Sequence, residues 1–253
     1  MSCPAVMFSL FLLSPCGSSG GNDSSAAVEK AVSNPQRPAV DVARDASRKP
    51  AEVLSFFSIE PGMTVLDLFS GSGYYTELLS GIVGENGRVI AHTNEAYIPF
   101  SGEIYKTRYL DGRLANTETI VTEADDIELE DNSLDAALMV LTWHDFIYSD
   151  PENGWQAVDE DLLLDKLCRA MKPGAVLGLI DHVANPGGDT TEVARNLHRI
   201  DPQAVRDSFA DSCFTLDAEA GFLRNAEDDH TLAVFDPSVR GKTDRFVFRF
   251  VRN

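Results

Sequence analysis

The feature that most constrains this chain is a glycine-rich turn between an apolar strand and a helix. Thr64 to Leu68 (TVLDL) has the short apolar pattern of a buried strand, and residues 70–73 (SGSG) follow it. The apolar spacing from Tyr74 to Val83 predicts a helix directly after the turn. Glycines at such a junction let the backbone approach a ligand closely and place it at the N-terminus of the helix. The sequence therefore predicts a site for a nucleotide-like cofactor here.

The rest of the chain predicts strands that alternate with helices, followed by two late strands. Before the turn, residues 40–57 have a helical pattern that is broken at Pro50. Further strands are predicted at residues 88–92, 119–122, 134–141, 175–180, 214–218 and 245–251, and helices at residues 101–114, 159–171, 191–197 and 202–213. This alternation is typical of a mostly parallel sheet with helices on both faces. Because no clear helix separates the last two strands, we expect an antiparallel hairpin at the sheet edge.

The N-terminus has the features of an export signal. Residues 5–13 (AVMFSLFLL) form an apolar run that is long enough for a signal peptide but too short to cross a bilayer. The following segment resembles a bacterial lipoprotein processing box, in which Cys16 is lipidated. We therefore expect a leader (1–16), a flexible tether (17–38) and one domain (39–253) in an exported, periplasmic or membrane-tethered protein. One alternative is a leader that is cleaved without lipidation. The other is a cytoplasmic protein whose apolar N-terminus is not a leader.

The net charge indicates which partners the protein can bind, and the cysteines bear on the redox state of its compartment. The formal net charge of −19 repels phosphate backbones, so we expect no nucleic-acid partner. Residues 114–165 contain fifteen Asp or Glu and no Lys or Arg, which disfavours an anionic substrate if this segment borders the site. Cys168 and Cys213 could pair in an oxidising compartment. However, Cys168 follows several leucines in a predicted helix, which favours a buried free thiol.

The sequence around the glycine turn resembles the first motif of class I S-adenosylmethionine-dependent methyltransferases. In VLDLFSGSGYYTELL, an apolar strand ends in an acid and a Gly-x-Gly-x-Gly-like loop follows, although Phe69 stands at the first glycine position. A dinucleotide fingerprint would instead need a small residue in place of Thr76. GRVIAH, the acidic turn at residues 124–126 and MKPGAVLGLIDH extend the resemblance, and the tail is similar to a narrower group of bacterial, often exported, predicted methyltransferases of unknown substrate. The resemblance implies a Rossmann-like, doubly wound, mostly parallel seven-stranded sheet with an antiparallel C-terminal hairpin, and S-adenosylmethionine as the cofactor.

Carried over to this chain, the family's cofactor contacts fall on three predicted loops. The cofactor-binding residues implied are Asp67, Phe69, Gly71, Gly73 and Tyr74 at the glycine turn, Asn94 and Glu95 after the second strand, and Asp125 and Asp126 in the acidic turn. Asp67 and the glycines would face the methionine end, Glu95 or Asn94 the ribose hydroxyls, and Asp125 the adenine. Asp67 could instead cap the next helix, and Asp125 could be a turn acid. Tyr74 could pack on the helix face rather than line the pocket.

Histidines after predicted strands are the candidates for the chemistry. His92, His144 and His182 each follow a strand, at the sheet edge where open parallel sheets bind ligands. We predict His144 as a general base, with Asp145 as its orienter or as an alternative base, and His182 as a second catalytic candidate. With Asp181, these histidines form two adjacent His/Asp pairs whose side chains suit divalent ions. Two pairs are weak evidence, so we predict no metal site.

These patterns together predict methyl transfer to an oxygen or nitrogen atom of a small neutral or cationic molecule. A non-catalytic exported ligand-binding module on the same fold is the first alternative, and a nucleotide-dependent oxidoreductase is the second. The polar runs at residues 198–199 and 240–245 either close the substrate side of the site or are solvated surface. Nothing in the sequence indicates the oligomeric state.

Overall fold

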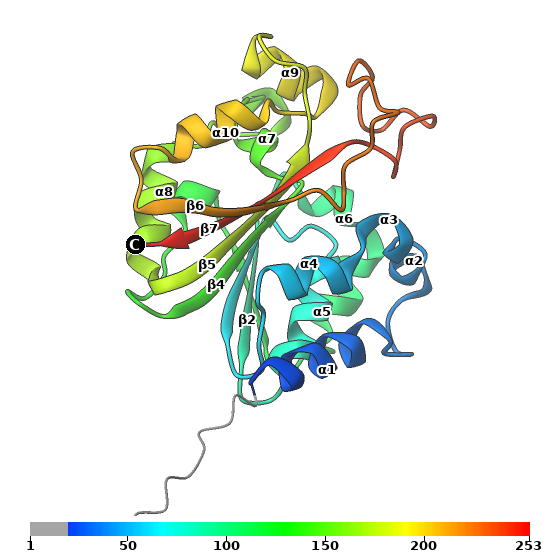
Figure 1. The fold of residues 1–253 in the computed structure, drawn as a ribbon, viewed down its shortest axis with the longest axis vertical. Helices are drawn as coiled ribbons and strands as arrows, with labels where there is room; N and C mark the ends of the chain where they lie inside the picture. Colours follow the sequence, from blue (N-terminus) through cyan, green and yellow to red (C-terminus); the bar gives the residue numbers. More distant parts are fainter. Residues whose placement is uncertain (1–19) are drawn as a thin grey trace, which may run out of the picture.

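The structure, a computed structural model, describes residues 20–253 and is built on a mixed sheet. Its seven strands lie in the order β3-β2-β1-β4-β5-β7-β6 (Figure 1). Their bounds are Thr64–Leu68 (β1), Arg88–Thr93 (β2), Thr117–Val121 (β3), Leu134–Val140 (β4), Met171–His182 (β5), Phe214–Ala220 (β6) and Arg245–Arg252 (β7). Strands β1 to β5 pair in parallel, whereas β7 is antiparallel to both β5 and β6. The predicted Rossmann-like, mostly parallel sheet with an antiparallel C-terminal pair is confirmed.

Helices cover both faces of this sheet (Figure 1). One face is covered by α1 (Gly20–Val32), α4 (Pro50–Phe56) and α5 (Tyr74–Val83), and the other by α7 (Trp143–Phe146), α8 (Glu160–Ala170) and α10 (Pro202–Phe209). The remaining α-helices of the described chain are α2 (Ala39–Val42), α3 (Asp45–Arg48), α6 (Ile98–Tyr105) and α9 (Thr190–Leu197). Because side chains alternate along a strand, Val65 and Leu66 of β1 enter opposite cores.

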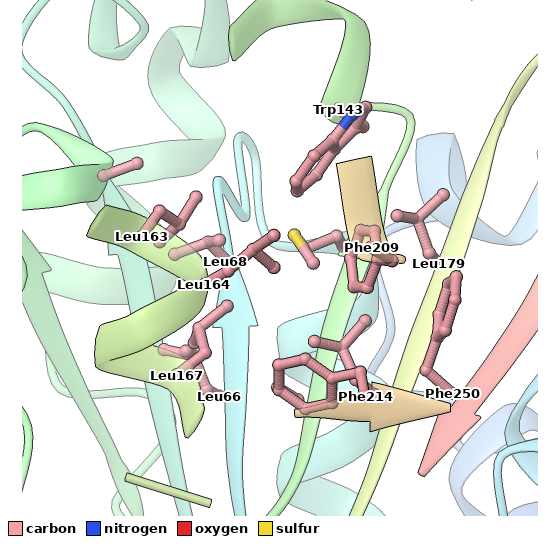
Figure 2. Close-up of a cluster of buried hydrophobic side chains, with 14 of the residues drawn as sticks. Leu66, Leu68, Trp143, Leu163, Leu164, Leu167, Leu179, Phe209, Phe214 and Phe250 are labelled. Atoms are coloured by element: carbon pink, nitrogen blue, oxygen red, sulfur yellow. The ribbon is translucent and has the colours of Figure 1, made fainter. Parts of the chain in front are cut away.

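The core between the sheet and α8 follows directly from the sequence of that helix. Asp159 caps it, since its carboxylate accepts a hydrogen bond from the Leu162 amide at 3.0 Å. Leucines at helical spacing then point to the sheet, where they meet strand leucines and aromatic rings (Figure 2). The residues labelled in this cluster are Leu66, Leu68, Trp143, Leu163, Leu164, Leu167, Leu179, Phe209, Phe214 and Phe250.

The segment predicted as a flexible tether is ordered where the structure describes it. Residues 20–32 form α1, and its side chains Val28 and Ala31 are buried against α5. The tether prediction is therefore wrong for this part, because the many polar and small residues hide an apolar face at i and i+3 spacing. The predicted leader, with Cys16, lies outside the described residues. Within residues 20–253, no helix has both the length and the apolar character needed to cross a membrane.

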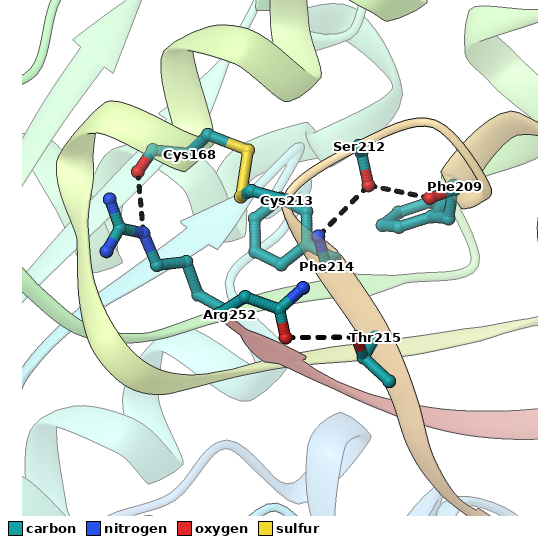
Figure 3. The surroundings of a disulfide bond; sticks show 8 residues. Cys168, Phe209, Ser212, Cys213, Phe214, Thr215 and Arg252 are labelled. Carbon is teal, nitrogen blue, oxygen red and sulfur yellow. Dashed lines mark hydrogen bonds between the residues drawn. A yellow bond between two sulfur atoms is a disulfide. The ribbon is translucent and has the colours of Figure 1, made fainter.

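Cys168 and Cys213 form a disulfide, which corrects the interpretation of Cys168 as a free thiol (Figure 3). Cys168 lies near the C-terminal end of α8, and Cys213 lies just before β6. Their Cα atoms are 6.0 Å apart, although 45 residues separate them in sequence. The sequence could not show this proximity, because it depends on how β6 is placed at the sheet edge. Arg252 of β7 adds a hydrogen bond to the Cys168 carbonyl at 3.1 Å.

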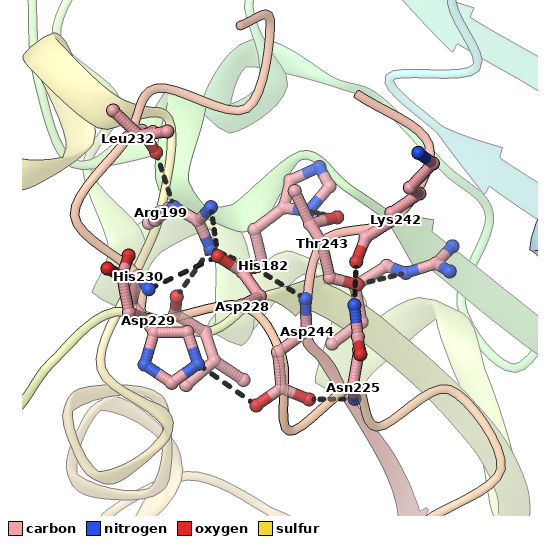
Figure 4. A network of polar contacts seen from close by, with 12 residues as sticks. His182, Arg199, Asn225, Asp228, Asp229, His230, Leu232, Lys242, Thr243 and Asp244 are labelled. Carbon is pink, nitrogen blue, oxygen red and sulfur yellow. Dashed lines mark hydrogen bonds and ion pairs between the residues drawn. The ribbon is translucent and has the colours of Figure 1, made fainter. Parts of the chain in front are cut away.

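The long connection between β6 and β7, residues 221–244, is held by a buried ion pair (Figure 4). The Arg199 guanidinium donates to both carboxylate oxygens of Asp228, at 2.9 and 3.1 Å. It also donates to the carbonyl oxygens of Val183 and Leu232. Asp228 in turn accepts from the Asp244 amide at 2.7 Å, at the start of β7. A single buried side chain thus links the segments just after β5 and α9 to this connection.

Candidate functional site

A large cavity lies at the carboxyl ends of the parallel strands. It has a volume of about 1240 Å³ and is bounded by the loops that follow β1, β2, β4 and β5. This is the edge at which open α/β sheets bind ligands. Small-molecule sites commonly measure about 300–1,000 Å³, so the cavity has room for more than one small molecule. Predicted site residues in its wall are Asp67, Phe69, Gly71, Tyr74, Glu95, His144, Asp145 and His182.

The glycine turn keeps the expected loop shape despite Phe69. Phe69 has a φ of +55°, in the left-handed region that favours glycine, so this residue adopts a backbone conformation that glycine adopts more readily. Its ring is buried edge-on against Phe146, at a centroid distance of 5.0 Å, and also contacts Tyr97 and Trp155. Aromatic packing around the ring offsets the cost of the strained backbone. The departure from the motif therefore adds a wall to the cavity and leaves the turn intact.

Gly73 is required for packing as well as for backbone conformation. It has a φ of +80° and begins α5. A Cβ atom at this position would clash with the Tyr109 hydroxyl oxygen and would lie 2.5 Å from Cδ of Arg108. Gly73 itself is not part of the cavity wall, whereas its neighbours Ser72 and Tyr74 are. Its role is thus to let the turn close against residues 108–109.

The variant Gly73→Ala is expected to lose clearly more stability than Gly62→Ala. Gly62 has a similar φ of +84°, but a Cβ atom at this position would have no atom within 4 Å, so its variant carries only the left-handed backbone penalty of about 1–2 kcal/mol. Gly73→Ala adds overpacking of roughly 1–3 kcal/mol. Urea unfolding of both variants measures the difference. Equal losses would show that contact with Arg108 and Tyr109 is unimportant.

Asp67 is a buried carboxylate at the end of β1. It accepts a hydrogen bond from the Thr76 hydroxyl at 2.5 Å and lines the cavity. Burial raises the pKa of Asp67 to about 6, although the Thr76 hydrogen bonds and the charges of Arg108 and Arg48 oppose the rise. Thr76 lies in the first turn of α5, so Asp67 contacts the start of this helix through a side-chain hydrogen bond. This contact agrees in part with the alternative prediction that Asp67 caps the helix. The carboxylate nevertheless faces the cavity and is available to a cation.

Two arginines in the cavity wall were not identified from the sequence. Arg44 and Arg48 come from the segment around α3, which packs over the glycine turn. Arg44 pairs with Asp41, whereas no ion pair among residues 20–253 involves Arg48. The Arg48 guanidinium lies over the Tyr74 ring, 4.7 Å from its centroid. The sequence gives no sign of this arrangement, since it depends on how the helices before β1 fold back over the turn.

Of the residues predicted to contact the ribose and the adenine, only some lie in the cavity wall. Glu95 lines the cavity. Asn94 is buried and holds the turn instead, because its amide group accepts from the Tyr97 amide at 3.0 Å and donates to Glu123 at 2.9 Å. Asp125 and its exposed neighbour Asp126 are not in the cavity wall.

Asp125 has a contact that explains its position. Its carboxylate accepts a hydrogen bond from the Asp159 amide at 2.8 Å, next to the start of α8. This hydrogen bond joins the acidic turn to the start of α8, which lies 34 residues further along the chain. Asp126 also lies outside the cavity wall, and the contact of Asp125 and Asp126 with the cofactor stays a prediction.

His144 lies between two carboxylates. Its Nδ1 is 2.8 Å from Oδ1 of Asp181, and its backbone amide donates to Oδ2 of the same residue at 3.0 Å. Its Nε2 is 3.3 Å from Oδ1 of Asp145. Burial disfavours the imidazolium, but the charges of Asp145 and Asp181 outweigh burial and raise the pKa of His144 to about 9. The orienting carboxylate is therefore Asp181, not Asp145 as the sequence suggested.

His182 and His92 have different surroundings from His144. His182 lines the cavity, and its Nδ1 is 2.8 Å from the Thr243 hydroxyl. Burial and the positive charges of His144 and Arg245 lower the pKa of His182 well below its usual value, so this imidazole is neutral. His92 is fully buried outside the cavity wall, and burial lowers its pKa to about 4. His182 is thus a neutral hydrogen-bonding group at the site.

His198 completes the polar part of the wall. It follows α9, and its Nδ1 is 3.6 Å from Oδ1 of Asp145. Phe235 and Arg240, from the connection between β6 and β7, also line the cavity. Within the runs 198–199 and 240–245, His198 and Arg240 thus border the site, whereas Arg199 is buried in its ion pair.

Comparisons with known proteins agree with this geometry. The family model for protein-L-isoaspartate(D-aspartate) O-methyltransferases matches residues 30–103, the segment that contains the glycine turn. A solved S-adenosylmethionine-dependent methyltransferase from Aquifex aeolicus superposes with a TM-score of 0.58, covering 90% of this chain and 98% of that one at 22% identity. The chain has the fold of class I S-adenosylmethionine-dependent methyltransferases. The resemblance stated from the glycine turn is thereby confirmed at the level of the fold.

Other similar proteins share the fold with varied chemistry. Geranyl diphosphate C-methyltransferase from Streptomyces coelicolor, solved with Mg²⁺, a substrate analogue and S-adenosyl-L-homocysteine, has a TM-score of 0.56 and 13% identity, over 88% of this chain and 84% of that one. The ubiquinone/menaquinone biosynthesis C-methyltransferase of Escherichia coli is 29% identical over 124 residues. That match covers 49% of this chain and 44% of the relative, so the chain spans under half the length of the curated relatives it matches.

Proposed function

We propose that this protein binds S-adenosylmethionine and transfers its methyl group to an oxygen or nitrogen atom of a small molecule. The observation that carries the proposal is the composition of the cavity. The glycine turn and Asp67 lie in the same wall as His144 and Asp145, and the volume of about 1240 Å³ accommodates a cofactor and an acceptor together. The fold places these groups at the strand ends where such ligands bind.

The chain offers complementary charges for the zwitterionic end of this cofactor. Asp67 supplies a buried carboxylate that fits an ammonium group. Arg48 supplies a guanidinium that fits a carboxylate, and its charge is close enough to act on Asp67. Glu95 provides a carboxylate that suits ribose hydroxyls. These residues fit the cofactor, and Phe69 and Tyr74 supply apolar surface beside them.

Arg48→Gln is expected to weaken binding of S-adenosylhomocysteine by about 10-fold or more, since a hydrogen bond to a charged group contributes about 1.5–3 kcal/mol. Arg240→Gln is the matched control, because Arg240 lines the same cavity but is exposed to solvent. Its affinity is expected to stay within about twofold of the parent protein. Calorimetric titration gives both values. A loss shared by the two variants would reflect the overall charge of the cavity and would contradict a specific contact with Arg48.

When bound, the cofactor supplies a methyl group whose carbon–sulfur bond breaks with its electron pair left on sulfur. The chain's contribution is to position the acceptor atom and to remove its proton, if it carries one. Because the raised pKa keeps the His144 ring protonated at neutral pH, Asp145, the alternative base of this pair, is the group that accepts the proton. Asp181 holds His144 in place by one hydrogen bond with Nδ1 of its ring and one from its backbone amide. His182 offers the acceptor a neutral hydrogen-bonding partner.

The charge of the acceptor is a separate part of the proposal. Of the acidic segment at residues 114–165, only Asp145 and Asp150 are in the wall, and they face Arg44, Arg48 and Arg240 in the same cavity. The wall therefore carries both signs, and the overall acidity of the chain does not decide the charge of the ligand. We retain a neutral or cationic acceptor because Arg48 is assigned to the cofactor, Arg44 is paired with Asp41 and Arg240 is exposed to solvent.

The test of catalysis is formation of S-adenosylhomocysteine from S-adenosylmethionine in the presence of pools of phenols, amines and small carboxylic acids. We expect turnover with a pool that contains neutral or cationic oxygen or nitrogen acceptors, and none with Asp67→Asn under the same conditions. Cofactor binding without turnover in any pool would favour the non-catalytic binding module. Turnover confined to the carboxylic acids would overturn the proposed charge of the acceptor.

We also propose that the protein is exported. The leader pattern supports this proposal, and so does the disulfide between Cys168 and Cys213, because disulfides persist in oxidising compartments. If Cys16 is lipidated, Cys16→Ser is expected to move the protein from the membrane fraction to the soluble periplasmic fraction. Fractionation followed by immunoblotting measures this shift. An unchanged distribution would count against the lipidated leader, and a cytoplasmic location with free thiols at Cys168 and Cys213 would count against export.

A further inference from the structure

We propose that His144, Asp145 and His198 form a binding site for one divalent transition-metal ion of the zinc type. Each contributes one ligand atom, and these atoms all lie within 4.8 Å of one another. His144 and Asp145 belong to α7, whereas His198 follows α9, 53 residues further along the chain. The sequence predicted no metal, because it showed only the adjacent pairs and contained no reason to bring His198 to them.

The spacing of the ligand atoms suits a tetrahedral ion. Nε2 of His144 is 3.3 Å from Oδ1 of Asp145, and Nδ1 of His198 is 3.6 Å from the same oxygen. Zinc binds nitrogen and carboxylate oxygen at about 2.0–2.2 Å, which places neighbouring ligands of a tetrahedron about 3.3–3.6 Å apart. Both of these separations fall in this range, and all three ligand atoms lie within 4.8 Å of one another.

The contacts around the ligands provide independent support. Metal-binding histidines commonly donate their other ring nitrogen to a carboxylate, which fixes the tautomer and the ring. Asp181 is in this position, with Oδ1 2.8 Å from Nδ1 of His144 and Oδ2 accepting from the backbone amide. The ring of His198 is held edge-on by Phe235, at a centroid distance of 4.7 Å. Two of the three ligands are therefore oriented by groups that do not ligate.

The chemistry of the three ligands indicates which ion the site prefers. Asp145 is buried, and its ion-pair partners among residues 20–253 are only the two histidines. Two imidazoles and one carboxylate suit zinc, iron, cobalt or nickel, whereas Mg²⁺ prefers oxygen ligands. The donor set therefore selects a transition metal over Mg²⁺.

The position of the site indicates what the ion would do, and this role rests on the proposed function. All three ligands line the cavity, so an ion can enter and keep a coordination position open towards the bound molecules. An acceptor that reaches that position would be one with a metal-binding oxygen or nitrogen atom. The site thus implies an acceptor that can bind a zinc-type ion. It would bind the ion through the atom that is methylated or through a neighbouring atom.

The experiment is calorimetric titration of the full, chelator-treated protein with Zn²⁺, and separately with Mg²⁺, followed by metal analysis of the dialysed protein. His198→Asn is the test variant and His230→Asn the control. Both histidines have a positive φ, +53° and +64°, which asparagine tolerates, so the two substitutions place similar demands on the backbone. We expect one tightly bound Zn²⁺ per parent chain, no comparable Mg²⁺ binding, at least a 10-fold loss for His198→Asn and no change for His230→Asn.

The proposal would be overturned if the parent chain does not bind one Zn²⁺, or if His198→Asn binds Zn²⁺ equally well. The second result would locate the metal elsewhere, including at the cysteines of the leader. Titration of the same samples with S-adenosylhomocysteine separates this outcome from failure of the proposed function. A chain that binds S-adenosylhomocysteine but not zinc refutes only the metal site. A chain that binds zinc but not S-adenosylhomocysteine refutes the proposed cofactor and leaves the metal site standing.

Discussion

Arg199→Met is expected to lower the free energy of unfolding by about 3–5 kcal/mol, because it leaves the carboxylate of Asp228 buried without its cation. The side chains of both residues are at most 1% exposed, so water cannot replace the lost contacts. The substitution also removes donors from two buried carbonyl oxygens, those of Val183 and Leu232. The consequence reaches the site, since the connection at residues 221–244 carries Phe235 and Arg240 to the cavity wall. Urea unfolding at neutral pH measures the loss.

Arg206→Met is the control for this prediction. Arg206 makes an ion pair with Glu219 on the surface, where such pairs contribute about 0–1 kcal/mol. The double variant Arg199→Met/Asp228→Asn is expected to recover part of the stability, because the buried negative charge is then removed as well. A loss for Arg199→Met as small as that for Arg206→Met would show that the ion pair does not hold the connection.

Asp67→Asn is expected to stabilise the empty protein while it weakens cofactor binding. The pKa of Asp67 is raised from 3.8 in the unfolded chain to about 6 in the fold. The folded chain therefore holds this proton more tightly, so ionisation of Asp67 destabilises the fold above pH 6, and this cost disappears as the pH falls towards 3.8. At pH 8 we expect the variant to be more stable by about 2–3 kcal/mol, with the difference vanishing near pH 4. Thermal or urea unfolding across this pH range measures the effect.

The same substitution is expected to reduce the affinity for S-adenosylhomocysteine by about 10- to 100-fold, because an amide replaces the carboxylate that faces the ammonium group. Asp126→Asn is the matched control, since Asp126 has the same side chain but is exposed and outside the cavity wall. Its affinity is expected to be unchanged. Opposite effects of Asp67→Asn on stability and on affinity would identify Asp67 as a binding residue kept at a cost to the fold. Unchanged affinity would remove Asp67 from the cofactor site.

Much of the fold follows from local patterns in the sequence. The glycine turn, the buried strands and the α8 pattern each depend on neighbouring residues, so periodicity and turn chemistry were sufficient to predict them. The alternating phenylalanines of β7 indicated its strand character, although its place between β5 and β6 depends on the sheet as a whole. Helix 101–114 was predicted as one element, but Gly102 has a non-helical conformation and residues 106–110 continue as a π-helix.

The candidate site was predictable only where a motif or a strand end marked it. Asp67, Glu95, His144 and Asp145 all reach the cavity from such positions. Arg48 does not follow from any local signal, because helices that precede the sheet in sequence must first fold back over the turn. The contact of Asp181 with His144 depends on the pairing of β4 with β5, which brings the ends of two strands together. Long-range packing of this kind leaves no local pattern in a single sequence.

The most direct test of the cofactor assignment is calorimetric titration of the full chain with S-adenosylhomocysteine, with NAD as the control. The full chain is needed because α1 packs against α5, so a chain that begins after residue 33 would lose part of its core. We expect one S-adenosylhomocysteine to bind per chain with micromolar or better affinity, and NAD not to bind measurably. Absence of S-adenosylhomocysteine binding, or preference for NAD, would contradict the account.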